Sequence, residues 1–145
     1  MSKELINLAD LNERPASLLD ARVLLAACDG NGVILTKIVE TLRAHLPPEL
    51  LRAEACLQRQ DAEALREAAH RLAGMVSAVS TAAASVASKL EDQAALGDLT
   101  EAPELIQQLD EMIRDVLVEV EHTTIEHLQR LVVPPNISTQ GRAHE

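Results

Sequence analysis

The sequence contains no phenylalanine, tyrosine or tryptophan, which restricts how its interior can be built. Hydrophobic residues still make up 47% of the 145 residues, so the chain is expected to fold rather than stay disordered. The core must then be filled by leucine, isoleucine, valine, alanine and methionine. Alanine and leucine favour helix, and the lack of aromatic residues weakens any case for strands. We therefore predict a single all-α domain that is long enough to enclose a core.

Apolar periodicity and helix-breaking residues divide this chain into expected helices at residues 18–28, 33–45, 48–59, 61–79, 82–96 and 101–131. Pro47 and Pro48 are expected to separate the second helix from the third, because each proline removes a backbone donor. Short connections between the later helices predict an antiparallel up-down four-helix bundle. An extra N-terminal helix or arm and a long C-terminal helix, with a bend expected near Thr123, complete this prediction.

The domain organisation expected from these signals has three parts. Residues 1–16 are polar and irregular and are interpreted as an N-terminal arm or linker. Residues 17–131 would form the helical bundle, and residues 132–145 would form a disordered tail. We find no internal repeat.

A histidine in the middle of the helix at 61–79 is the main candidate for function. Apolar residues at spacings of three and four form a stripe on this helix: Ala62, Leu65, Ala69, Leu72, Val76 and Val79. On a helical wheel His70 lies roughly 130° from the centre of that stripe, so it should face solvent with Glu67 and Gly74 as neighbours. Glycine costs a helix interior about 1 kcal/mol relative to alanine. The bare patch at Gly74 would allow a partner surface to approach the imidazole.

The segment Ala69–Gly74, read as Ala-His-Arg-Leu-Ala-Gly, resembles the His-x-Leu-Lys-Gly signature of histidine-phosphotransfer (HPt) domains of bacterial two-component phosphorelays. The resemblance covers roughly residues 20 to 120 and extends to residues on both sides of the motif: Pro47, Asp61, Leu90, Glu91, Gly97, Asp98, Leu99, Leu105 and Leu109. It implies a phosphorelay intermediate. His70 would accept a phosphoryl group from the aspartate of a response-regulator receiver domain and pass it to another receiver domain.

One position departs from the family signature. The usual lysine, three residues after the histidine, is Ala73 in this chain. That lysine is thought to help hold the phosphoryl group, so its absence puts transfer rate and phosphohistidine lifetime in question. Arg66 lies one turn before His70 and Arg71 directly follows it, and both guanidinium groups are candidates to replace the lysine.

The transfer chemistry needs a neutral imidazole with one nitrogen free to attack. Nε2 is expected to be the nucleophile, so Nδ1 should need an orienting hydrogen bond. The level of His70 in an antiparallel hairpin matches residues near Glu91, which makes Glu91 or Gln93 candidate partners; a fully solvated His70 is the other possibility. No metal site or cofactor is expected in this chain, and magnesium is expected on the partner receiver domain.

Charge and composition argue against several other classes of protein. Acidic residues outnumber basic ones by 23 to 13, and the formal net charge of −10 should repel nucleic acid. No apolar run reaches the ~18 residues of a membrane span, and no signal peptide is apparent. Cys28 and Cys56 show no metal-ligand spacing and are expected to be reduced. We expect a cytoplasmic protein without direct membrane contact, with any tether to a membrane sensor outside this sequence.

Two alternatives stay open beside phosphotransfer. The chain is also consistent with a helical docking module that binds a receiver without being phosphorylated, an interpretation that Ala73 supports. A dimerising bundle that pairs through the last helix is the other. The resemblance further suggests origin in a hybrid sensor histidine kinase, although no phosphate-binding loop indicates an ATP site in this chain.

Overall fold

The computed structural model describes residues 18–132, which form six helices and their connections. The expected arm (1–16) and, apart from Val132, the expected tail lie outside the described residues. The described part of the chain contains no strand. Its helices are α2 (Ala21–Cys28), α3 (Gly32–Gln58), α4 (Ala62–Val76), α5 (Thr81–Ala95), α6 (Ala102–Glu121) and α7 (Ile125–Val132).

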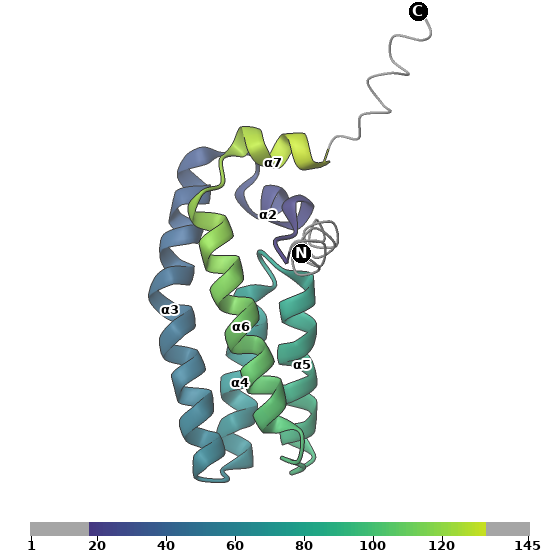
Figure 1. Cartoon of the computed structure of the whole chain (residues 1–145). Coiled ribbons are helices and arrows are strands. Elements are labelled where there is room, and N and C mark those ends of the chain that lie inside the picture. Colours follow the sequence, from purple (N-terminus) through teal and green to yellow (C-terminus); the bar gives the residue numbers. More distant parts are fainter. Residues whose placement is uncertain (1–17, 133–145) are drawn as a thin grey trace, which may run out of the picture.

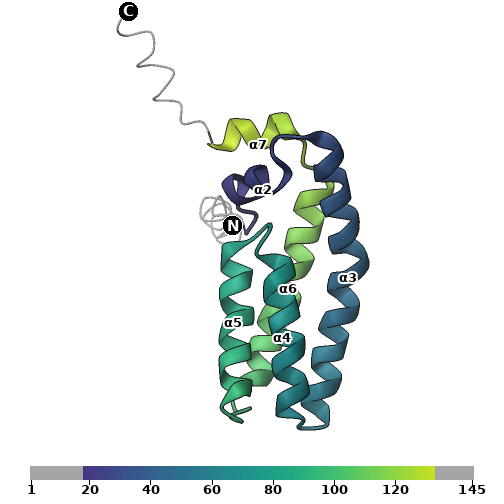
Figure 2. The same cartoon turned by 180° about the vertical axis from the view of Figure 1, so that it is seen from behind.

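The four longest helices form an antiparallel bundle (Figure 1). Each of α3, α4 and α5 packs against the next helix, and α6 returns to α3, so the four enclose one core. The two short helices, α2 and α7, contact each other and lie across the end of the bundle where α3 begins (Figure 2). The predicted all-α, up-down bundle is therefore confirmed. No helix within residues 18–132 is long and apolar enough to cross a membrane.

The core is built without aromatic residues, as the composition required. Its fully buried positions hold aliphatic side chains and the two cysteines, while Met75 and Met112 pack at its margin. Small side chains at the contact let α4 and α5 approach closely, and these helices make the most extensive helix–helix contact of the bundle. The fully buried alanines of the two helices are Ala68, Ala69, Ala83 and Ala87.

The expected break at the proline pair is wrong. Helix α3 runs without interruption from Gly32 to Gln58 and contains both Pro47 and Pro48. The prolines lie on the exposed side of the helix, whereas Leu46 and Leu50 beside them are buried. Water can therefore solvate the carbonyl groups that lack a helical donor, while core packing holds the helix through the pair. Tertiary burial overrides local propensity here.

This arrangement predicts that Pro47→Ala stabilises the protein. Alanine restores a backbone N–H at a position that is helical and exposed. Part of this gain is offset because proline also restricts the unfolded chain, and we expect a net rise in the free energy of unfolding of about 1 kcal/mol. Urea denaturation measures the change. Pro103→Ala is the matched control, because Pro103 lies in the first turn of α6, where the N–H has no helical acceptor. Equal gains in both variants would contradict the prediction.

The last helix is shorter than expected. The sequence interpretation continued it to Leu131, but α6 ends at Glu121 and α7 begins at Ile125. The Thr123 hydroxyl donates to the Glu119 carbonyl at 2.6 Å, which satisfies a carbonyl that a continuing helix would have used. Leu128 of α7 is fully buried. The bend expected near Thr123 is thus a complete break, and α7 turns back to cover α2.

The segment before α2 fixes the turn between α4 and α5. The Asp20 N–H donates to the Val79 carbonyl at 2.6 Å, and the Asp20 carboxylate accepts a hydrogen bond from the Thr81 hydroxyl at 2.8 Å. The same carboxylate caps α2 by accepting from the Val23 N–H. Asp20 therefore ties the end of α4 and the start of α5 to the helices that close the bundle.

Candidate functional site

Helix α4 positions the candidate site along its exposed face. The Asp61 carboxylate caps its N-terminus by accepting from the Ala64 N–H at 3.1 Å. The predicted apolar stripe is buried apart from Ala62, which is half-buried. Because the stripe fixes the rotation of the helix, the opposite face points to solvent. His70, Glu67 and Gly74 all lie on this exposed face, as the helical wheel predicted.

The His70 imidazole is exposed but has a defined partner. Its side chain is 71% exposed, and Nδ1 lies 3.0 Å from Glu91 Oε2 on α5. An ionised carboxylate only accepts hydrogen bonds, so Nδ1 must carry a hydrogen and donate the hydrogen bond to Glu91. A neutral ring in this tautomer has its lone pair on Nε2, which has no partner among the described residues. In that tautomer the Nε2 lone pair of an exposed ring is left without a partner within residues 18–132.

The second candidate partner of His70 is placed elsewhere. Gln93 Nε2 donates to Glu101 Oε1 at 3.3 Å, so the expected contact with His70 is not made. The reason is helical geometry, since two residues correspond to about 200° of rotation around α5. Glu91 therefore faces α4, whereas Gln93 faces the start of α6.

Open space surrounds the glycine that follows His70. A Cβ atom built on Gly74 would meet no other heavy atom within 4 Å. Gly74 has an ordinary helical backbone in the last turn of α4, and no left-handed conformation requires glycine there. The missing side chain leaves the surface flat one helical turn from the imidazole. No neighbouring group among the described residues covers this position.

Two shallow hollows meet at Gly74, between α3 and α4. The first has a volume of about 300 Å³ and is mainly apolar, with Ile34, Lys37, Ile38, Thr41, Leu42, Gly74, Met75 and Ala78 around it. The second has a volume of about 490 Å³; much of its wall is apolar, but it is bordered by charged and histidine side chains, with His45, Pro48, Glu49, Arg52, His70, Arg71, Gly74 and Met75 around it. We call these the apolar hollow and the polar hollow. The imidazole stands at the edge of the polar hollow.

The polar hollow contains a carboxylate that the sequence interpretation missed. Glu49 Oε2 accepts from Arg71 Nε at 2.9 Å and lies 3.4 Å from Arg52 Nε. The Glu49 side chain is only 10% exposed, and it lies on the apolar stripe of α3 between Leu46 and Leu50. A helical wheel drawn through the proline pair places Glu49 on that stripe. The expected break in α3 concealed this signal.

The other candidate cation, Arg66, lies one turn before His70 but does not border the polar hollow. Its guanidinium donates to both carboxylate oxygens of Glu63, at 2.6 and 3.3 Å, and lies 4.0 Å from Glu67. This hydrogen-bonded contact holds the pKa of the Glu63 carboxyl below its usual range and raises the pKa of Arg66. Ala73, at the position of the family lysine, is half-buried against the core.

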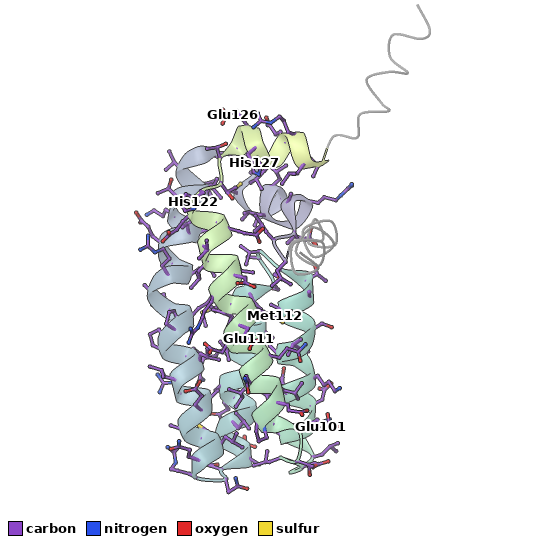
Figure 3. All side chains as sticks on the ribbon, in the orientation of Figure 1. Glu101, Glu111, Met112, His122, Glu126 and His127 are labelled. Carbon is purple, nitrogen blue, oxygen red and sulfur yellow. The ribbon has the colours of Figure 1, made fainter. Side chains whose placement is uncertain are left out.

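The remaining described histidines and cysteines form no comparable site. His122 and His127 lie at the end of the bundle that α2 and α7 cover (Figure 3). Cys28 and Cys56 are buried and reduced. Within residues 18–132, no cluster of three or more histidine, cysteine or acidic side chains is placed to hold a metal ion. His144 lies outside the described residues.

Comparison with known proteins agrees with this geometry. The family model of the Hpt domain matches residues 37–119. The crystal structure of histidine-containing phosphotransfer protein B (HptB) from Pseudomonas aeruginosa PAO1 superimposes with a TM-score of 0.62 and 31% sequence identity, covering 79% of this chain and 97% of that chain. No curated protein matches the sequence. The helical bundle and the family match together show that this chain belongs to the Hpt domain family.

Proposed function

We propose that this chain is a phosphorelay intermediate. His70 accepts a phosphoryl group from the phospho-aspartate of a receiver domain and passes it to the aspartate of another. The observation that carries the proposal is the hydrogen bond from His70 Nδ1 to Glu91, which orients an exposed ring so that Nε2 is left without a partner among the described residues, beside the open surface at Gly74. The family match and the name of HptB support the same function.

The proposed transfer needs no reactant besides the imidazole and the phospho-aspartate, because one bond to phosphorus forms as another breaks. The Nε2 lone pair attacks phosphorus in line, an N–P bond forms, and the P–O bond to the donor aspartate breaks with its electrons returning to the carboxylate. The ring gains positive charge as the bond forms, and the Glu91 carboxylate 3.0 Å away stabilises that charge. Transfer onward reverses these steps, with a second aspartate attacking phosphorus and the lone pair returning to Nε2.

The receiver is proposed to dock over the two hollows between α3 and α4. The apolar hollow offers Ile34, which is 40% exposed, together with the half-buried Ile38 and Met75. The polar hollow supplies arginines to an acidic partner. Magnesium would belong to the receiver domain, and the steps above use no metal bound to this chain.

A transfer assay tests the proposal. The chain is incubated with a receiver domain carrying labelled phosphate on its aspartate, and the reaction products are treated separately with acid and alkali. We expect label on the chain that is lost in acid, stable in alkali and located by mass spectrometry in the peptide containing His70. Adding an unphosphorylated receiver should remove it. Absence of label despite receiver binding would favour a docking module that is not phosphorylated.

Glu91→Ala should slow phosphorylation of His70 about threefold, because a charge-assisted hydrogen bond at an exposed site contributes only modestly. The variant removes both the tautomer preference and the negative charge beside the ring. The rate of labelling by phosphoramidate, a small donor that needs no docking surface, measures the effect. Glu67→Ala is the control, since it removes an exposed carboxylate from the same face of α4. A rate unchanged in Glu91→Ala would show that the contact has no role in the chemistry.

A further inference from the structure

One carboxylate oxygen, Glu49 Oε2, contacts two arginine side chains that border the same hollow as His70. Arg71 on α4 and Arg52 on α3 both approach Glu49 Oε2 through Nε, at 2.9 and 3.4 Å. Contact through Nε leaves the terminal amino groups of each guanidinium without a partner among the described residues. All three side chains border the polar hollow that also contains His70. The cluster carries a net charge of +1 in a chain whose formal net charge is −10.

Burying the Glu49 carboxylate costs free energy unless charged partners offset it. It lies on the buried stripe of α3, where the neighbouring stripe residues are leucines, and burying a charged group costs free energy that its partners must offset. The arginines, in contrast, are 48% and 60% exposed. A buried anchor that carries exposed guanidinium groups is a means of positioning them.

We propose that Glu49 is a positioning residue that holds Arg71 and Arg52 so that their terminal amino groups bind the phosphoryl group carried by His70. This inference rests on the function proposed above. It also accounts for Ala73, because the positive charge missing at that position is supplied from the other side of His70. A planar guanidinium can donate two parallel hydrogen bonds to phosphate oxygens. A guanidinium whose Nε is already held by a carboxylate loses less conformational freedom when it binds them.

Arg66 serves as the natural contrast. It lies on the same helix and carries the same charge, but both of its bonds go to Glu63 on the exposed surface, and it does not border the polar hollow. Replacing Arg66 or Arg71 with glutamine changes the net charge equally. A specific role for the Glu49 cluster therefore predicts different results for the two variants, whereas a general effect of charge predicts similar ones.

The experiment follows the phosphoryl group of phosphorylated His70 by ³¹P NMR during a pH titration. Phosphoramidate loads the full chain, so receiver docking is not involved. Arg71→Gln should raise the phosphoryl pKa by about half a unit, because a nearby cation favours the dianion at a solvent-exposed site. Arg71→Lys should restore part of the shift, and Arg66→Gln should raise the phosphoryl pKa by clearly less than Arg71→Gln does.

Glu49→Gln is the most discriminating variant, because charge removal and loss of positioning predict opposite changes in the phosphoryl pKa. Simple removal of a negative charge would favour the phosphoryl dianion and lower its pKa. Loss of positioning would raise the pKa, as in Arg71→Gln, because the guanidinium groups are no longer held at the hollow. We expect the rise.

Several results would overturn the inference. A lower pKa in Glu49→Gln, or equal shifts in Arg66→Gln and Arg71→Gln, would exclude positioning by Glu49. Reduced thermal stability without any change in phosphoryl pKa would make the cluster a structural link between α3 and α4 only. If phosphoramidate and a phosphorylated receiver both fail to load His70, the proposed function fails and this inference fails with it.

Discussion

Replacing His70 with glutamine abolishes acid-labile labelling by a phosphorylated receiver. Glutamine retains a polar side chain of similar reach, but its amide nitrogen has no lone pair available for attack on phosphorus. The fold should persist, because the imidazole is 71% exposed and its hydrogen bond to Glu91 is the one polar contact it makes within residues 18–132. We expect the free energy of unfolding to stay within about 0.5 kcal/mol of the original value. Labelling and urea denaturation, measured on the same sample, check both parts.

His45→Gln is the control for this prediction. His45 is exposed and borders the same polar hollow, so it would be the nearest alternative acceptor on α3. Full labelling of His45→Gln together with background labelling of His70→Gln would assign the phosphoryl group to His70. Label retained after loss of His70 would remove that residue from the mechanism.

Replacing Gly74 with glutamine should slow transfer from a receiver by about tenfold or more, the kinetic equivalent of about 1.4 kcal/mol. The added side chain projects from the point where the two hollows meet, and it prevents a receiver from approaching the ring closely. Labelling by phosphoramidate should continue at the original rate, since a small donor does not need this surface. The ratio of the two rates therefore isolates docking from chemistry.

Stability should not fall in this variant. A Cβ atom at Gly74 meets no heavy atom within 4 Å, and replacing glycine inside a helix by a better helix former adds several tenths of a kcal/mol. Gly32→Gln is the matched control, because that glycine also has open space around it but lies at the start of α3. Slower transfer in both glutamine variants, or in neither, would contradict docking across Gly74.

Much of the site follows from the sequence because it depends on helical periodicity. The apolar stripe of α4 fixes which side of the helix faces the core, and the exposure of His70 and Gly74 follows directly. From the sequence, the pairing of His70 with Glu91 is one of three possibilities, beside Gln93 and a fully solvated ring, since counting residues from the turn gives the level on α5 but not the side. The structure resolves this choice through the rotation of α5.

The polar hollow could not be predicted in the same way. Its charged α3 residues, Glu49 and Arg52, come after the proline pair, and local propensity predicts a helix break at that point. Only burial of Leu46 and Leu50 by other helices keeps α3 continuous, and burial is a property of the whole bundle. The failure to identify Glu49 follows from the same cause, because its place on a buried stripe exists only if the helix continues.

The proline pair also has a mechanical consequence. Pro47 and Pro48 cannot donate to the carbonyls of Arg43 and Ala44, four residues earlier, and those carbonyls lie between the part of α3 that borders the apolar hollow and the part that borders the polar one. The longest described helix thus lacks two backbone hydrogen bonds between its two contact areas, where we expect it to bend most easily. Independent adjustment of the two halves would suit the proposed carrier, which would have to fit a donor and an acceptor of different shape in turn.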